Sequence, residues 1–262
     1  MSENRQSEKR RGAGWVRLAG PGWHFPTLGA AVMVLVFAGI ALTGGVVDET
    51  GRVRDFYGLL GLNWEGLRAG RWWQPLTHAW LHASWGHVLL NAGLFYYGAS
   101  RLDHILGRGR SWRVFSAGVL AGAAAQVLVQ AWRPEMSQDP LVGASGGVMA
   151  LLLALVTLSP ESRMLLLPVS GKNLGRGFLL AAFLLFIMTP QLGVPVFGAF
   201  GRLLVRVGLG EIFAIGHLYH LAGGLAGCWW AARLFGKPVS LAQLQEERRR
   251  REELASGTRS VE

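Results

Sequence analysis

The 262-residue chain has a single cysteine, Cys228, and few charged residues for its length. One cysteine excludes an intrachain disulfide framework and any zinc site with several cysteine ligands. Charged residues make up 16% of the chain against 51% hydrophobic residues, and the mean hydropathy is +0.30. Soluble domains carry about 25% charged residues, so this balance favours a membrane protein.

Aspartate and glutamate are absent from six long apolar stretches, each close to the roughly 20 residues that a helix needs to cross a bilayer. These stretches are 28–47, 76–100, 114–132, 141–158, 178–196 and 212–232. We therefore predict an all-α, polytopic membrane protein with a bundle of six transmembrane helices. Pro190 and Pro195 interrupt the fifth stretch, which predicts a kink or a short helix there. Without acids in the membrane, an intramembrane aspartyl protease is excluded.

The basic excess, 26 Lys and Arg against 16 acids, is distributed as in a membrane protein. Four arginines and one aspartate lie in the loop 101–113, whereas 133–139 has one arginine and two acids. By the positive-inside rule, both termini are expected in the cytoplasm. The predicted parts are a basic tail, 1–27, a six-helix domain, 28–235, and a charged tail, 236–262.

This charge pattern disfavours nucleic-acid binding, because the basic residues are spread over loops and tails. The N-terminal segment also lacks the small-residue cleavage site that would follow the apolar core of a secretory signal. These two features suit a protein of a bacterial inner membrane.

A metal centre is also disfavoured. The His-Glu-x-x-His motif of zinc proteases is absent, and the pairs His78 with His82 and His217 with His220 have no cysteine or carboxylate beside them. We therefore expect neither a metal nor another cofactor.

Polar side chains are costly inside a membrane and are functional candidates by default. The six stretches contain only a small set of candidates: His82, His87, Asn91, Ser145, His217 and His220. His87 and Asn91 are four residues apart, so they share one face of a helix and can point at the same site.

Ser145 lies in the sequence Gly-Ala-Ser-Gly-Gly, where its neighbours have almost no side chain. The sixth stretch is also rich in glycine, with Gly216, Gly223, Gly224 and Gly227. Small residues let helices approach closely in membranes. Such a contact between the fourth and sixth stretches could bring the serine hydroxyl within hydrogen-bond reach of an imidazole.

Three motifs in order, His87-Val-Leu-Leu-Asn91, Gly143-Ala-Ser145-Gly146 and His220 followed by Gly223 and Gly227, resemble those of the rhomboid intramembrane serine proteases. The resemblance runs from about Trp72 to Ala232. It implies hydrolysis of peptide bonds in or near transmembrane segments of membrane-protein substrates. It also implies a dyad of Ser145 as nucleophile and His220 as general base, with His87, Asn91 and the Ser145 N–H holding the oxyanion.

Several alternatives and departures accompany this resemblance. His217 could compete with His220 as the base, while His78 and His82 are expected to be structural hydrogen-bonders. Met149 stands where the family often has an aromatic residue stacked on the imidazole, so a sulfur contact is one alternative. Trp73 is followed by Gln74 instead of the usual arginine, which puts the anchoring of the first external loop in question.

The resemblance and the prolines of the fifth stretch together predict lateral substrate access at that helix, with 197–210 as a cap. The alternative function is a catalytically silent rhomboid-like protein that binds transmembrane segments. The presence of the serine, both histidines and the asparagine disfavours this alternative.

Overall fold

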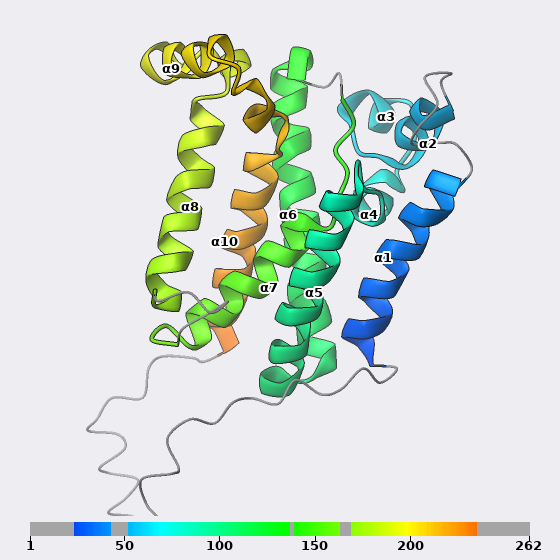
Figure 1. Ribbon diagram of the computed structural model, residues 1–262, viewed down its shortest axis with the longest axis vertical. Helices are drawn as coiled ribbons and strands as arrows, with labels where there is room; N and C mark the ends of the chain where they lie inside the picture. The colour runs from blue at the N-terminus through cyan, green and yellow to red at the C-terminus, as the bar shows by residue number, and fades with distance from the viewer. Residues whose placement is uncertain (1–23, 43–51, 137–138, 163–168, 235–262) are drawn as a thin grey trace, which may run out of the picture.

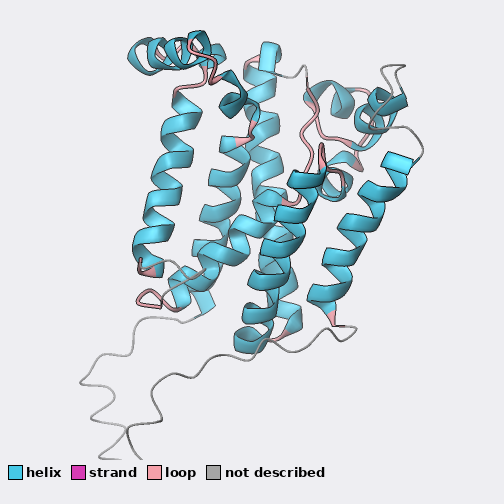
Figure 2. Ribbon diagram, in the orientation of Figure 1, coloured by secondary structure: helices cyan, strands magenta, loops and turns pink. Residues whose placement is uncertain are grey.

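The computed structural model describes residues 24–42, 52–136, 139–162 and 169–234. Its described part is helical and has no strand; an isolated antiparallel bridge joins Leu62 and Leu141 (Figures 1 and 2). The predicted all-α fold class is thus confirmed. The predicted tails 1–27 and 236–262 lie outside the described residues, apart from 24–27.

Six long helices follow the six apolar stretches in order. They are α1 (Phe25–Leu42), α5 (Trp85–Leu106), α6 (Arg108–Trp132), α7 (Ser145–Leu158), α8 (Gly171–Ile187) and α10 (His217–Leu234). Among the described helices, α1 and α6 are long and apolar enough to cross a membrane by length and composition, and α7 is a shorter apolar helix. The count of six spans therefore stays a prediction.

Helix α7 lies at the centre of the bundle. The other long helices run roughly side by side along the long axis, and α7 is inclined between them (Figure 1). It packs against α10, α6, α5 and α8, and ten of its 14 residues are buried. Its side chains form much of the main hydrophobic core together with Phe95, Leu102 and Phe115.

Glycines set the spacing between α7 and α10. A Cβ atom at Gly223 would overlap the backbone of Gly146, and one at Gly227 would overlap the backbone of Ala150. The predicted close approach of the fourth and sixth helices is therefore observed as backbone-to-backbone contact. Gly118 of α6 also lies against α7, since a Cβ atom there would overlap the Ala150 Cβ atom and the Gly146 carbonyl oxygen.

Several helix boundaries differ from the predicted stretches, and three of them affect the segments around the site. Helix α5 begins at Trp85 and not near residue 76, because the Ser84 side chain caps it by accepting the His87 N–H at 3.2 Å. Helix α8 ends at Ile187, ahead of both prolines, which start the next two short helices. Helix α10 begins at His217, five residues after the predicted start at 212.

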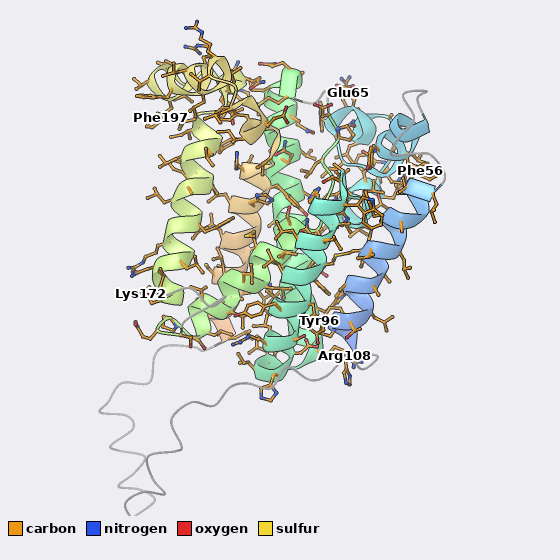
Figure 3. The ribbon with its side chains drawn as sticks, in the orientation of Figure 1. Phe56, Glu65, Tyr96, Arg108, Lys172 and Phe197 are labelled. Atoms are coloured by element: carbon orange, nitrogen blue, oxygen red, sulfur yellow. The ribbon has the colours of Figure 1, made fainter. Side chains whose placement is uncertain are left out.

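One end of the bundle carries a group of short helices: α2 (Arg52–Leu60), α3 (Trp64–Arg68), α4 (Gln74–Thr77) and the 3-10 turn η2 (His78–Trp80). Glu65 lies at this end together with Phe197, whereas Arg108 and Lys172 lie at the opposite end (Figure 3).

Gln74 anchors this group although it replaces the expected arginine. Its fully buried side chain donates from Nε2 to the carbonyl oxygen of Gly58 at 3.0 Å and accepts the Asn63 N–H at 3.4 Å. Arg71 donates to the same Gly58 oxygen at 2.8 Å. The displaced arginine and the glutamine together thus do the anchoring that the sequence left in question.

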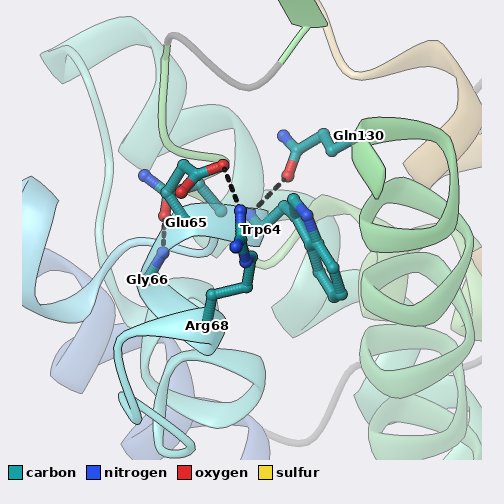
Figure 4. A network of polar contacts seen from close by, with 6 residues as sticks. Trp64, Glu65, Gly66, Arg68 and Gln130 are labelled. Atoms are coloured by element: carbon teal, nitrogen blue, oxygen red, sulfur yellow. Dashed lines mark hydrogen bonds and ion pairs between the residues drawn. The ribbon is translucent and has the colours of Figure 1, made fainter. Parts of the chain in front are cut away.

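The group is also attached to α6. The buried Gln130 accepts the backbone N–H of Trp64 at 3.0 Å through its Oε1 atom (Figure 4). Asn63 caps α3 by accepting the Gly66 N–H, and Arg68 lies 3.8 Å from Glu65 (Figure 4). The short helices are therefore joined to one another through Gln74 of α4 and to the bundle through Gln130 of α6.

Between α8 and α10 the chain forms η4 (Pro190–Leu192), α9 (Pro195–Arg206) and η5 (Gly210–Ala214). Helix α9 lies across the end of α8 (Figure 1) and contacts α8, η4 and η5. The segment 197–210, predicted as a cap over the site, is thus mainly a helix seated on α8.

We expect Gly227→Ala to lower the free energy of unfolding by about 1–3 kcal/mol, because the added methyl group would force α10 away from α7. The matched control is Gly93→Ala on α5, where a Cβ atom meets nothing within 4 Å; this variant should be neutral or more stable by about 0.5–1 kcal/mol. Reversible unfolding in detergent measures both. Equal stabilities would contradict the role given to this glycine contact.

Candidate active site

Ser145 is the first residue of α7, and the segment before it is shaped by Gly143. This glycine has φ +116°, a conformation that side-chain-bearing residues rarely adopt, and its N–H donates to the His78 carbonyl oxygen at 2.9 Å. Two residues earlier, Leu141 exchanges backbone hydrogen bonds of 2.8 and 2.9 Å with Leu62. The segment that precedes Ser145 is thus hydrogen-bonded to the region of the short helices.

His220 faces Ser145 from the first turn of α10. Its Nε2 atom lies 2.6 Å from the serine Oγ, although 75 residues separate the two in sequence. This is the distance of a strong hydrogen bond, so the imidazole and the hydroxyl are in position to exchange a proton.

His217, the competing candidate, is engaged elsewhere. Its Nε2 atom lies 2.7 Å from the carbonyl oxygen of Ile212 in η5. Because a carbonyl oxygen can only accept, this nitrogen carries the proton and cannot act as a base in that position. His220 is therefore the histidine that contacts the serine, whereas His217 connects η5 to α10.

His87 of α5 borders the serine, and Asn91 lies one turn further along the same helix. The Nδ1 atom of His87 accepts the Ala83 N–H at 3.5 Å, which leaves Nε2 to carry the proton of a neutral ring. A Cβ atom built on Gly143 would lie 2.7 Å from this Nε2 atom and 3.8 Å from Ser145 Oγ, so both side chains border the same glycine. Asn91 is buried, and its Nδ2 atom donates to the His87 carbonyl oxygen at 3.0 Å.

Ser145, His87 and His220 share one structural property: each lies in the first turn of its helix. The first N–H groups of a helix have no intrahelical partner, and the helix dipole makes this end positive. No side chain caps α7, whose N-cap residue is Ala144. The site is therefore suited to stabilise a negative charge that develops beside the serine.

Tyr219, next to His220 in sequence, is a residue that the sequence analysis did not select. It is fully buried, and its hydroxyl donates to the Gly143 carbonyl oxygen at 3.1 Å. The same hydroxyl lies 3.2 Å from His78 Nε2, while His78 Nδ1 lies 2.9 Å from the Gln74 carbonyl oxygen. Tyr219 thus joins α10 to the segment before Ser145. A tyrosine in an apolar stretch, whose hydroxyl needs a partner when buried, is the signal that could have found it.

The prediction that His78 and His82 are structural hydrogen-bonders is confirmed for His78 and wrong for the His82 ring. His82 is fully buried, and neither ring nitrogen has a hydrogen-bond partner within the described residues. Its ring packs edge-to-face on His87 with centroids 5.0 Å apart. Met149 packs against the main hydrophobic core.

Together, the fold and the site define a helical protein in which a serine and a histidine meet at the first turns of two packed helices. The sequence matches the rhomboid domain over residues 69–237, and the chain belongs to the rhomboid family, a family of intramembrane proteases. This confirms the resemblance found in the sequence.

The chain is also 27% identical over 215 residues to the rhomboid protease GluP of Bacillus subtilis (strain 168). The match covers 75% of this chain and 40% of that protein, so the chain spans about two fifths of the length of this curated relative.

Removal of the Tyr219 hydroxyl tests the connection between α10 and Gly143. Tyr219→Phe keeps the ring but leaves the Gly143 oxygen without this donor, and we expect it to lower the free energy of unfolding by about 1–3 kcal/mol. Tyr97→Phe is the matched control, because the Tyr97 ring packs under Arg101 and remains in the variant. If unfolding in detergent gives the same loss for both variants, the hydroxyl is not what connects these elements.

Proposed function

We propose that this protein is a serine endopeptidase that hydrolyses peptide bonds in or near transmembrane segments. The observation that carries the proposal is the 2.6 Å contact between His220 Nε2 and Ser145 Oγ. The helices that provide the two residues, α7 and α10, contain no aspartate or glutamate. No ion pair in the described part of the chain involves His220, so the pair is proposed to act as a dyad without a carboxylate.

In the proposed reaction, His220 accepts the hydroxyl proton while Ser145 Oγ attacks the scissile carbonyl carbon. The tetrahedral intermediate collapses as the imidazolium gives this proton to the leaving amine, and an acyl-enzyme ester remains. Water then attacks the ester while His220 takes the proton of this water, and the imidazolium gives the proton to Ser145 Oγ as the second product leaves. All proton transfers thus pass through the same Nε2 atom, which is unprotonated again at the end of the cycle.

The oxyanion of the tetrahedral intermediate needs donors that are already in place. Three are available in the proposed site: the N–H of Ser145, the Nε2–H of His87 and an amide hydrogen of Asn91. The bond from Asn91 to the His87 carbonyl oxygen uses one amide hydrogen and fixes the amide group. The other hydrogen is then free to face the oxyanion.

The depth of the site follows from the length of α7. Fourteen residues make a helix of about 21 Å, shorter than the roughly 30 Å hydrocarbon core. In a six-span arrangement with both termini in the cytoplasm, Ser145 lies below the outer surface of the membrane, and water reaches it from outside. Glu65 lies at the end of the bundle assigned to the outer side, and Arg108 and Lys172 lie at the end assigned to the cytoplasm (Figure 3). Basic residues on the cytoplasmic side support this orientation. A bacterial inner membrane fits it.

The substrate is proposed to reach the site sideways from lipid, past α8. This helix has few buried residues, among them Gly171, Gly175 and Ala182, and Leu180 and Phe183 are exposed on it. A weakly packed helix can move at low cost. Substrates with glycine or proline near the outer boundary are expected, because these residues expose the backbone for attack.

The first test is cleavage of a single-span substrate by the purified protein in detergent. Ser145→Ala and His220→Ala should each lower kcat by about 10⁶-fold, to below detection, because either change removes the dyad. His217→Ala should keep most of the activity, since this ring bonds η5 and not the serine.

Thermal unfolding of the three variants shows whether each one folds. Full activity of Ser145→Ala would contradict the proposal. An inert wild-type protein that still binds a transmembrane peptide would favour the silent, binding-only alternative.

The oxyanion donors are tested separately. His87→Ala and Asn91→Ala should each lower kcat by about 10²–10³-fold with a smaller change in KM, because the lost bond forms mainly in the transition state. If KM rose by a similar factor while kcat stayed constant, these side chains would instead bind the substrate in its ground state.

Lateral access is tested by a tether between α5 and α8. In a Cys228→Ser protein, a disulfide between cysteines introduced at facing positions in the outer halves of these helices should reduce cleavage of a transmembrane substrate, and a reductant should restore it. Single-cysteine variants under the same oxidising conditions are the controls. Cleavage that is unaffected by the tether would place the access route elsewhere.

A further inference from the structure

Helix α9 stands apart from the long helices in its direction. It lies across the end of α8 (Figure 1), after a turn in which Gly193 has φ +69° and with Pro195 as its first residue. Its 12 residues make a helix of about 18 Å, which is too short to cross a bilayer. The helix therefore has another role than spanning.

The side of α9 that faces the protein is made of glycine. Gly198 and Gly201 are its buried residues, and a Cβ atom at Gly201 would overlap the Met188 carbonyl oxygen. The helix is thus pressed by this side onto the turn at the end of α8, and its larger side chains point elsewhere.

The side away from the protein is apolar. Val196, Phe200 and Leu203 are 66%, 57% and 51% exposed, and their spacing of four and three residues places them on one face. Phe197 borders this face and lies at the edge of the molecule (Figure 3). Such a row of large apolar side chains needs a cover other than water.

Two arginines flank the apolar face. Arg202 and Arg206 are exposed, and neither forms an ion pair with any residue in the described part of the chain. Long basic side chains beside an apolar face are typical of helices that lie in a membrane interface, where the cations reach lipid phosphates.

We infer that α9 lies in the plane of the membrane, in the lipid–water interface on the outer side of the bilayer. Its apolar face then lies among the acyl chains, and its arginines contact lipid phosphate groups. This inference rests on the proposed membrane placement of α8. It has a consequence for the site, because α9 leads into η5, which His217 holds beside His220. Lipid contact at α9 thereby fixes the loop that precedes the general base.

Spin labels on single cysteines test the inference in Cys228→Ser protein reconstituted into phosphatidylethanolamine and phosphatidylglycerol vesicles. Labels at Phe200 and Leu203 should show a several-fold higher ratio of oxygen to nickel-chelate collisions than a label at the exposed Glu65. A label at Leu180, on the exposed face of α8, is the reference for lipid.

Water-like values at Phe200 would overturn the inference, as would exclusion of both reagents, which would indicate cover by protein or by a second copy. Water-like collision ratios at Leu180 as well as at Phe200 would instead contradict the placement of α8 in the membrane. The double variant Arg202→Glu, Arg206→Glu should shift the Phe200 label towards the Glu65 values; no shift would contradict the role of the arginines. None of these readouts depends on protease activity.

Discussion

The contact between the backbones of α7 and α10 is the constraint on which the site depends. Helices in lipid gain little from the hydrophobic effect between them, so they associate through close packing of small residues. Gly223 and Gly227 remove the side chains that would separate α10 from α7. His220 lies one turn before Gly223 on the same helix, and its 2.6 Å contact with Ser145 follows from this spacing. Misplacement by about 1 Å is enough to lower a rate about 10²-fold.

The non-helical segment before Ser145 is the second requirement, because in the proposed membrane placement its backbone must have its hydrogen bonds satisfied within the protein. Leu62 pairs with Leu141, and the His78 carbonyl and the Tyr219 hydroxyl pair with the two polar groups of Gly143. The short helices and α10 thus provide the hydrogen-bond partners that this backbone would otherwise find within a regular helix. This allows α7 to begin at Ser145 itself, with the serine at the positive end of a helix.

The order of the helices and the four candidate residues of the site could be selected from the sequence, because apolar length and rare polar positions are both local signals; the roles proposed for these residues came from the family resemblance. Helix starts could not be selected in this way, since an apolar run continues through Leu76 and Leu81 while the Ser84 cap sets the start of α5. A helix that began at Leu76 would place His87 about three turns from its start, whereas His87 lies in the first turn of α5.

The hydrogen bonds of Tyr219 and Gln74 could not be predicted, for a different reason. Their partners, Gly143 and Gly58, are distant in sequence, and the pairing exists only once the chain is folded. The tyrosine also explains nearby glycines that the sequence left without a specific cause. A Cβ atom at Gly146 would lie 2.6–2.9 Å from the Tyr219 ring, and Gly122 of α6 faces the same ring. One aromatic side chain thus determines residue choice on two other helices.

Within the described residues, no carboxylate forms an ion pair with His220, which is consistent with the charge changes of the proposed reaction. An ionised carboxylate as a third member of the site would have to be placed among the packed helices, at a large desolvation cost. In the tetrahedral intermediate, by contrast, the positive charge on His220 and the negative charge on the oxyanion form together, so the site stays neutral overall. Three helix N-termini would disfavour an isolated imidazolium, but they stabilise the oxyanion that accompanies it. The arrangement thus favours the charged pair of the intermediate over a protonated histidine in the resting enzyme.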